Sequence, residues 1–149
     1  MKEQSLYQVS IAGTELVFDI NENDTLLGGI LRARVGIPYE CNAGGCGSCK
    51  YTLIEGEVVD DLHESPGLRA SDRRKNKHLA CISHPRSDCT IQIKPDNHYI
   101  PKHPPQKLQA TLQSIEKLTH DLWEFRFESG QAARFLPRQY AKVDIPGVT

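Results

Sequence analysis

The first strongly patterned stretch of the chain alternates hydrophobic and polar residues. Residues 7–11 (YQVSI) and 16–20 (LVFDI) place every second side chain on one face, which is the period of a half-buried strand. The segment AGT at 12–14 between them is typical of a tight turn. The pattern therefore predicts a β-hairpin.

The next hydrophobic stretch has the spacing of an amphipathic helix over residues 25–35. Asp24 and Thr25 can cap its first turn, and Gly36 can end it before Pro38. The expected apolar face consists of Leu26, Leu27, Ile30, Leu31 and Val35.

Shorter apolar runs follow, with the period of strands. We expect strands over residues 50–54, 58–59, 79–82 and 90–94, and an exposed helical turn over residues 71–77. Several strands and one main helix in this order predict an α+β fold.

A proline-rich segment then divides the chain. Residues 95–107 (PDNHYIPKHPPQK) contain four prolines and read as a stiff linker between a domain at 1–94 and a segment at 108–149. Three strands can begin a β-barrel but hardly close one, so we expect an incomplete barrel there. Its strands are expected over 108–117, 121–129 and 139–145.

Composition narrows the possible partners. The chain has 149 residues, 38% of them hydrophobic, and a formal net charge of −1, so no bulk charge attracts nucleic acid or anionic lipid. No apolar run approaches the ~20 residues that a membrane helix needs. The polar start, residues 1–10, does not resemble a secretory signal, and we expect a cytoplasmic protein.

The five cysteines carry the most specific information. An odd number without a signal sequence argues against a disulfide framework and favours metal binding. Cys41, Cys46 and Cys49 have the spacing C-x4-C-x2-C, and Cys81 follows after 31 intervening residues. Glycines between the first three thiols permit positive φ angles and expose backbone N–H groups. These groups, with the Ser48 hydroxyl, can hydrogen-bond to sulfur.

This spacing resembles the plant-type [2Fe–2S] ferredoxin signature. The segments PYECNAGGCGSCKYTLIEGEV (38–58) and LACISHP (79–85) are similar to the ferredoxin domain of reductases that serve bacterial aromatic and hydrocarbon monooxygenases, such as toluene, phenol and methane monooxygenase reductases. In that family a flavin-binding barrel and an NADH domain follow. The segments FLPRQY (135–140) and VDIPG (143–147) resemble the first part of the flavin barrel.

The resemblance implies a β-grasp ferredoxin domain that transfers one electron at a time. Cys41 and Cys46 would hold an outer iron of a [2Fe–2S] cluster, and Cys49 and Cys81 an inner one. The donor would be a reduced flavin domain and the acceptor an oxygenase or hydroxylase component. FAD and NADH are expected only in a full-length parent, of which this chain is alternatively the N-terminal portion.

Two features depart from the family pattern. Arg138 occupies a position that is usually glycine, and the sequence ends before the R-x-Y-S motif that helps to hold the flavin in that family. We therefore expect no complete catalytic site in this chain, and an electron-transfer component rather than an NADH oxidase.

Other readings remain open at this stage. Four cysteines can hold a structural zinc ion, although zinc sites usually pair two C-x2-C segments. Cys81-x2-His84 supplies half of a Rieske pattern, and a thiol enzyme would need an orienting group that is not evident. Cys89 is expected to be a packed core side chain. Two further groups are ambiguous: the basic run at 73–77, which is a solvated face or a docking site, and the aromatic residues at 123, 125 and 127, which fill a barrel core or shield a flavin.

Overall fold

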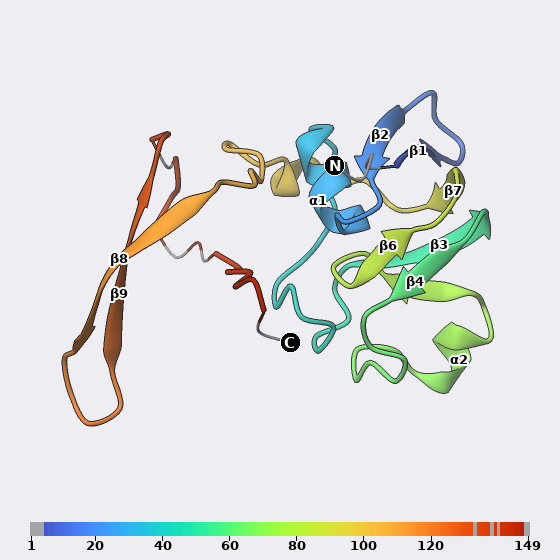
Figure 1. The fold of residues 1–149 in the computed structure, drawn as a ribbon. Coiled ribbons are helices and arrows are strands. Elements are labelled where there is room, and N and C mark those ends of the chain that lie inside the picture. Colours follow the sequence, from blue (N-terminus) through green and yellow to red (C-terminus); the bar gives the residue numbers. More distant parts are fainter. Residues whose placement is uncertain (1–4, 133, 138, 140, 148–149) are drawn as a thin grey trace. The chain divides into compact units, whose positions relative to one another are not determined.

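The structure, a computed structural model, describes residues 5–132, 134–137, 139 and 141–147 (Figure 1). The chain divides into two compact units, Met1–Pro105 and Gln106–Thr149. Each unit is described by itself below.

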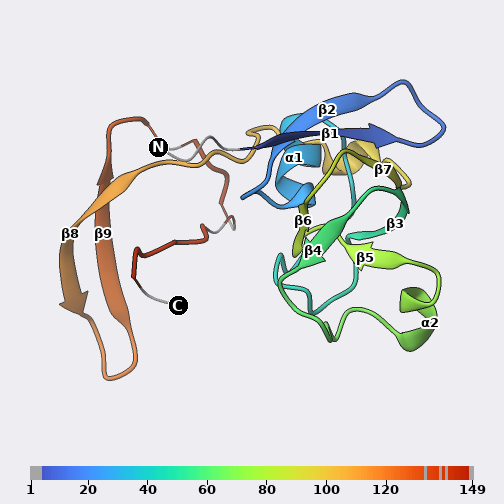
Figure 2. The ribbon, with the colours of Figure 1, turned by 45° about the vertical axis from the view of Figure 1, so that its right-hand side comes forward.

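The first unit is built on a mixed five-stranded sheet (Figures 1 and 2). Its strand order is β2-β1-β7-β3-β5. β1 and β7 are parallel, whereas the other neighbouring pairs are antiparallel. The strands are β1 (Leu6–Ile11), β2 (Val17–Asn21), β3 (Lys50–Glu55), β5 (Lys77–Leu79) and β7 (Cys89–Gln92).

The predicted hairpin is confirmed. β1 and β2 pair in antiparallel register, with Val9 opposite Phe18. Val9, Ile11 and Ile20 are almost fully buried because they point from the sheet into the core.

The main helix, α1 (Leu26–Arg32), covers the sheet and contacts β2. Thr25 caps it as expected, since its hydroxyl accepts a hydrogen bond from the Gly28 N–H at 3.1 Å. The close approach of α1 to β2 requires a small residue at position 29, where an added Cβ would lie 2.6 Å from Ile20.

The predicted end of this helix at Val35–Gly36 is wrong. Arg34 adopts a left-handed conformation, φ 61°, and the N–H groups of Arg34 and Val35 turn back to the carbonyls of Leu31 and Ile30. This is a Schellman arrangement, which closes the helix after Arg32. The left-handed residue that ends the helix is an arginine, so the prediction that relied on Gly36 placed the end of the helix too late.

A second, two-stranded sheet flanks the first. It pairs β4 (Val58–Asp60) with β6 (Ser83–Pro85), and the short helix α2 (Ala70–Arg73) lies at the predicted helical turn. The predicted strand at 79–82 is wrong, because β5 ends at Leu79 and a turn leads into β6. The turn forms since Ala80 bonds to two other segments, donating to Cys49 and accepting from Leu27.

The segment after β7 packs back on the first unit. Asp96 donates its N–H to the Gly36 carbonyl at 2.9 Å, and Arg34 donates to the Pro101 carbonyl at 3.0 Å. The 3-10 turn η1 (Asn97–Tyr99) brings the Tyr99 ring to 6.3 Å from that of Tyr39. These contacts fix the chain that leads into the first cysteine.

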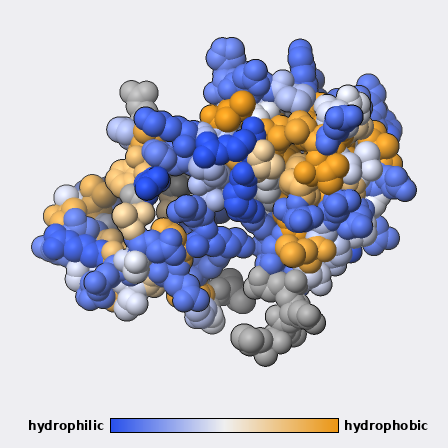
Figure 3. Space-filling model, turned by 90° about the horizontal axis from the view of Figure 1, so that it is seen from above, coloured by the Kyte–Doolittle hydropathy of each residue, from blue (hydrophilic) through white to orange (hydrophobic). Residues whose placement is uncertain are grey.

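The second unit is an antiparallel hairpin of β8 (Ala110–Lys117) and β9 (Trp123–Ser129), which confirms the first two strands expected there. The third, at 139–145, is wrong for residues 139 and 141–145, which form no strand; Tyr140, like Arg138, lies outside the described residues. Trp123, Phe125 and Phe127 remain about half exposed, because among the described residues of this unit no strand beyond β8 and β9 covers them. Hydrophobic surface appears on both units (Figure 3).

Throughout the part of the chain that the structure describes, no helix has the length and apolar character required to cross a membrane.

Candidate metal centre

The three clustered cysteines lie in the loop between α1 and β3. Between Cys41 and Cys49, three residues have left-handed backbone conformations: Asn42 (φ 50°), Gly44 (φ 79°) and Gly47 (φ 78°). Left-handed residues among right-handed and extended ones turn successive N–H groups toward the inside of a loop. Glycine adopts this conformation without strain, and asparagine tolerates it better than most residues.

The sulfur of Cys41 is the main acceptor of these N–H groups. Ala43, Gly45 and Cys46 donate their backbone N–H to Cys41 Sγ at 3.4, 3.3 and 3.4 Å. Three N–H donors directed at one sulfur can offset the negative charge that this sulfur would carry as a metal ligand.

Cys46 is the most exposed of the four candidate ligands. Its Sγ lies 3.4 Å from the Ser48 hydroxyl and accepts the Ser48 backbone N–H at 3.5 Å. The Ser48 hydroxyl, followed by backbone hydrogen bonds, lowers the pKa of the Cys46 thiol to about 6. The expectation that backbone N–H groups and the Ser48 hydroxyl face the sulfurs is therefore confirmed.

Cys49 and Cys81 form the buried part of the site. Their exposed fractions are 3% and 0%, and their side chains hydrogen-bond to each other. That hydrogen bond, together with burial, raises the pKa of the Cys49 thiol. The 3.0 Å bond from the Ala80 N–H to the Cys49 carbonyl brings the two chain segments together.

The structure thus places the four predicted cysteines in neighbouring segments, as two pairs. Cys41 and Cys46 share hydrogen bonds on the outer side, Cys49 and Cys81 share one on the inner side, and the charge of Cys46 acts on Cys49. Among the described residues, no three Cys, His, Asp or Glu side chains converge on a position for a single metal ion.

This arrangement fits a two-iron cluster better than a zinc ion. A structural zinc ion needs four ligands around one point, whereas each iron of a [2Fe–2S] cluster needs two thiolates. The site offers two pairs of thiols, with N–H groups directed at the outer sulfurs. This matches the two thiolates that each iron of the cluster needs.

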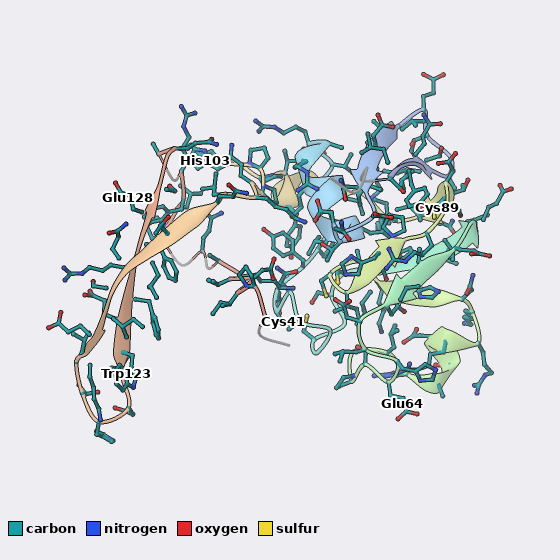
Figure 4. The ribbon with its side chains drawn as sticks, in the orientation of Figure 1. Cys41, Glu64, Cys89, His103, Trp123 and Glu128 are labelled. Carbon is teal, nitrogen blue, oxygen red and sulfur yellow. The ribbon has the colours of Figure 1, made fainter. Side chains whose placement is uncertain are left out.

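The remaining candidates lie apart from this site. Cys89 is buried at the start of β7, where its Sγ faces the carbonyls of Ser87 and Glu57 at 3.2 and 3.5 Å. Figure 4 shows Cys41 and Cys89 well separated within the first unit. His84 is paired with Asp61 at 3.1 Å rather than with a cysteine, which removes the Rieske reading. Cys89 is packed in the core as expected.

In the basic run at 73–77, Arg74 and Lys75 lie on an exposed face, whereas Arg73 and Lys77 have polar partners. Arg73 donates to the carbonyls of His63 and Ser65 at 2.6 and 2.9 Å, and Lys77 lies 3.7 Å from Asp72. The sequence indicated basic residues but gave no sign that one of them fixes the segment beside the cysteine loop. Only the fold reveals that role.

A mixed sheet with one main helix and a loop of cysteines beside it defines a ferredoxin-type iron–sulfur domain. Residues 9–86 match the family model described as the 2Fe-2S iron-sulfur cluster binding domain. The match covers more than half of the chain, and the chain belongs to this family. The expected α+β fold and the [2Fe–2S] cofactor are thereby confirmed.

The relatives include reductases and reductase components of oxygenase systems. The chain is 37% identical over 147 residues to the ferredoxin–NAD(P)(+) reductase CarAd of Metapseudomonas resinovorans, covering 96% of this chain and 44% of that protein. It is 35% identical over 131 residues to the ferredoxin–NAD(+) reductase component of the alkene monooxygenase system of Xanthobacter autotrophicus, covering 87% and 40%.

A solved structure supports the same assignment. The ferredoxin reductase in carbazole 1,9a-dioxygenase superposes with a TM-score of 0.86 at 38% identity, over 91% of this chain and 42% of that one. The chain therefore resembles a reductase of an oxygenase system, and it spans less than half the length of the relatives that it matches.

Proposed function

We propose that this chain carries single electrons through a [2Fe–2S] cluster held by Cys41, Cys46, Cys49 and Cys81. The observation that carries the proposal is the pairing of the four thiols, one pair at the surface and one in the core. The cluster supplies reversible one-electron chemistry when it is bound, and the protein sets how readily that electron is accepted.

The residues around the thiols suit this role. Reduction adds one negative charge to the site, and the three N–H groups on Cys41 with the Ser48 groups on Cys46 stabilise it. Burial of Cys49 and Cys81 keeps water away from the inner side. The partially exposed Cys41 and the exposed Cys46 mark the side from which a partner can be reached. No general acid or nucleophile is required.

We further propose that the parent protein is an NADH- and FAD-dependent reductase with this chain as its N-terminal portion. The proposed division is a ferredoxin domain at 1–94, a linker at 95–107 and the first strands of a flavin barrel at 108–149. The support is that this chain matches reductases across both of its units and covers only about 40% of their length. Electrons would pass from NADH through flavin to this cluster and on to a cytoplasmic oxygenase component.

Metal and sulfide analysis of anaerobically purified protein tests the cluster. Two irons and two sulfides per chain are expected, and Cys41→Ala, Cys46→Ala, Cys49→Ala and Cys81→Ala are each expected to abolish them. Zinc at one ion per chain, or a colourless protein after reconstitution with iron and sulfide, would contradict the proposal.

A second experiment tests the partner. Dithionite-reduced protein is mixed anaerobically with the oxidised oxygenase component of a carbazole dioxygenase or alkene monooxygenase system, and reoxidation of the cluster is followed by absorbance. Faster reoxidation than with an equal concentration of serum albumin supports an oxygenase acceptor. Equal rates with every component tested contradict it.

A further inference from the structure

The turn at residues 65–67 contacts the cysteine loop directly through backbone atoms. The N–H of Gly67 donates to the Gly44 carbonyl at 3.0 Å, and a Cβ added at Gly67 would lie 2.8 Å from both Gly44 O and Gly47 N. Such an approach leaves no room for a side chain. Figure 4 shows Cys41 and Glu64, the neighbour of Ser65, both toward the lower part of the first unit.

The carbonyl of Gly44 accepts a second hydrogen bond, from the hydroxyl of Ser65. Ser65 is 1% exposed, so water does not compete for this carbonyl from the serine side. Both hydrogen bonds therefore act on the oxygen of one peptide group, in a poorly solvated place where they are electrostatically strong.

The same peptide group serves Cys41 at its other end. A trans peptide is planar, with its C=O and N–H on opposite sides. The unit between Gly44 and Gly45 therefore directs its carbonyl to Ser65 and its N–H to Cys41 Sγ, which it reaches at 3.3 Å. Hydrogen bonding at the oxygen polarises the peptide and makes the N–H a stronger donor.

Arg73 holds the far side of this connection. Its guanidinium donates to the carbonyls of His63 at 2.6 Å, Ser65 at 2.9 Å and Leu68 at 3.4 Å. Three carbonyls on one planar cation fix the course of the turn that carries the Ser65 hydroxyl. The order of contact is Arg73, Ser65, the Gly44–Gly45 peptide and Cys41.

From this geometry we propose that Ser65 is a positioning residue that raises the reduction potential of the cluster through the Gly44–Gly45 peptide. The proposal rests on Cys41 being a cluster ligand, as proposed above. Reduction adds charge at the sulfurs, and a stronger N–H donor on Cys41 stabilises the reduced state more than the oxidised one. Ser65 touches no sulfur itself.

Potentiometric titration of the cluster-loaded protein tests this role. Ser65→Ala is expected to lower the equilibrium constant for one-electron reduction about threefold, which corresponds to a potential about 30 mV more negative at 59 mV per tenfold change. Arg73→Lys is expected to lower it in the same direction by less, since it loosens the turn and keeps the hydroxyl. If Ser65→Ala does not bind the cluster, the potential of Arg73→Lys still tests the role of Ser65.

A matched control separates this effect from loss of a buried hydroxyl. Ser83 is also buried, at 0% exposure, and its hydroxyl bonds to the Leu79 carbonyl and to Asp60, away from the cysteine loop. Ser83→Ala is expected to leave the potential unchanged. Resonance Raman bands of the iron–cysteine bonds are expected to lose part of their shift in deuterated water in Ser65→Ala and to keep it in Ser83→Ala.

The outcomes distinguish two failures. Ser65→Ala and Arg73→Lys at the unsubstituted potential, or Ser83→Ala shifted as far as Ser65→Ala, would overturn the role of Ser65 while leaving the cluster in place. Absence of iron and sulfide from the unsubstituted protein would overturn the proposed function, and the role of Ser65 with it.

Discussion

The two cysteine pairs reach the same site by different physical routes. The outer pair, Cys41 and Cys46, lies in one short loop whose left-handed residues turn N–H groups onto Cys41. The inner pair, Cys49 and Cys81, joins segments 32 residues apart within the hydrophobic core. Local backbone conformation thus forms one half of the site, and long-range packing forms the other. The halves are expected to respond differently to substitution.

The largest expected difference is between Cys81→Ala and Cys41→Ala. Both are expected to reduce bound iron and sulfide to background. Cys81 is fully buried, so its replacement also leaves a cavity and is expected to lower the free energy of unfolding of the metal-free protein by about 2 kcal/mol. Cys41→Ala removes a partly exposed side chain and is expected to change it by less than about 0.5 kcal/mol.

Iron content and urea unfolding of the metal-free variants measure both quantities. Equal destabilisation by the two substitutions would show that the inner pair is no more tied to the core than the outer pair.

The next effect concerns the contact between the cysteine loop and the turn beside it. Gly67→Ala places a Cβ 2.8 Å from Gly44 O and Gly47 N, so the loop must move. We expect iron content to fall at least about fivefold, since displaced N–H groups no longer face Cys41. Gly45→Ala is the matched control, because nothing lies within 4 Å of its added Cβ. Loading of Gly67→Ala at the level of Gly45→Ala would contradict this reading.

Cys89→Ala separates a buried cysteine from a ligand. Cys89 is 3% exposed, like Cys49, but faces two backbone carbonyls. The substitution is expected to keep full iron content and cost about 1 kcal/mol of unfolding free energy. Bleaching as complete as in Cys81→Ala would show that the ligand set is assigned incorrectly.

The smallest effect tests the contacts of Asp60, in β4, with His78 in β5 and Ser83 in β6. Burial alone would raise the pKa of the Asp60 carboxyl, but hydrogen bonds from His78 and Ser83 outweigh it and hold the pKa below its usual range. A lowered pKa in the folded state means that the ionised group stabilises the protein above its unfolded pKa of about 3.9. That contribution is lost as pH falls through the lower folded value.

Asp60→Asn is therefore expected to lower the free energy of unfolding by about 1 kcal/mol at pH 7. This is the difference between a hydrogen bond to a charged group and one to a neutral group. The cost is expected to shrink as pH falls below the unfolded pKa of about 3.9 and to vanish once Asp60 is protonated in the folded protein. Urea unfolding of both metal-free proteins from pH 3 to pH 7 measures the difference. A difference that does not change with pH would rule out ionised Asp60 as its source.

The sequence predicted the half of the site that is local. The spacing of Cys41, Cys46 and Cys49 with intervening glycines indicated a tight loop, and the alternation at residues 7–20 indicated the hairpin. Cys81 was placed by its resemblance to a family pattern. No local pattern shows that Ala80 bonds to both Cys49 and Leu27, and these bonds are what end β5 and bring Cys81 inward.

The same limit explains the other errors. The predicted end of α1 relied on glycine, the residue that most often adopts the left-handed conformation after a helix. Here Arg34 adopts it, because the Schellman hydrogen bonds to Ile30 and Leu31 stabilise that conformation. Nothing near Ser65 in sequence points to its contact with Gly44, 21 residues away. Contacts between distant segments determine features such as the Ser65–Gly44 contact, and the periodicity of hydrophobic residues does not predict these contacts.

The most direct test of the central claim is quantitative electron paramagnetic resonance of the protein before and after reduction with dithionite. We predict no signal in the oxidised protein and, after uptake of one electron, a spin-one-half signal that integrates to about one spin per chain. A protein that contains iron but stays silent after reduction, or one that takes up no electron, would contradict the claim that these four cysteines hold a one-electron [2Fe–2S] centre.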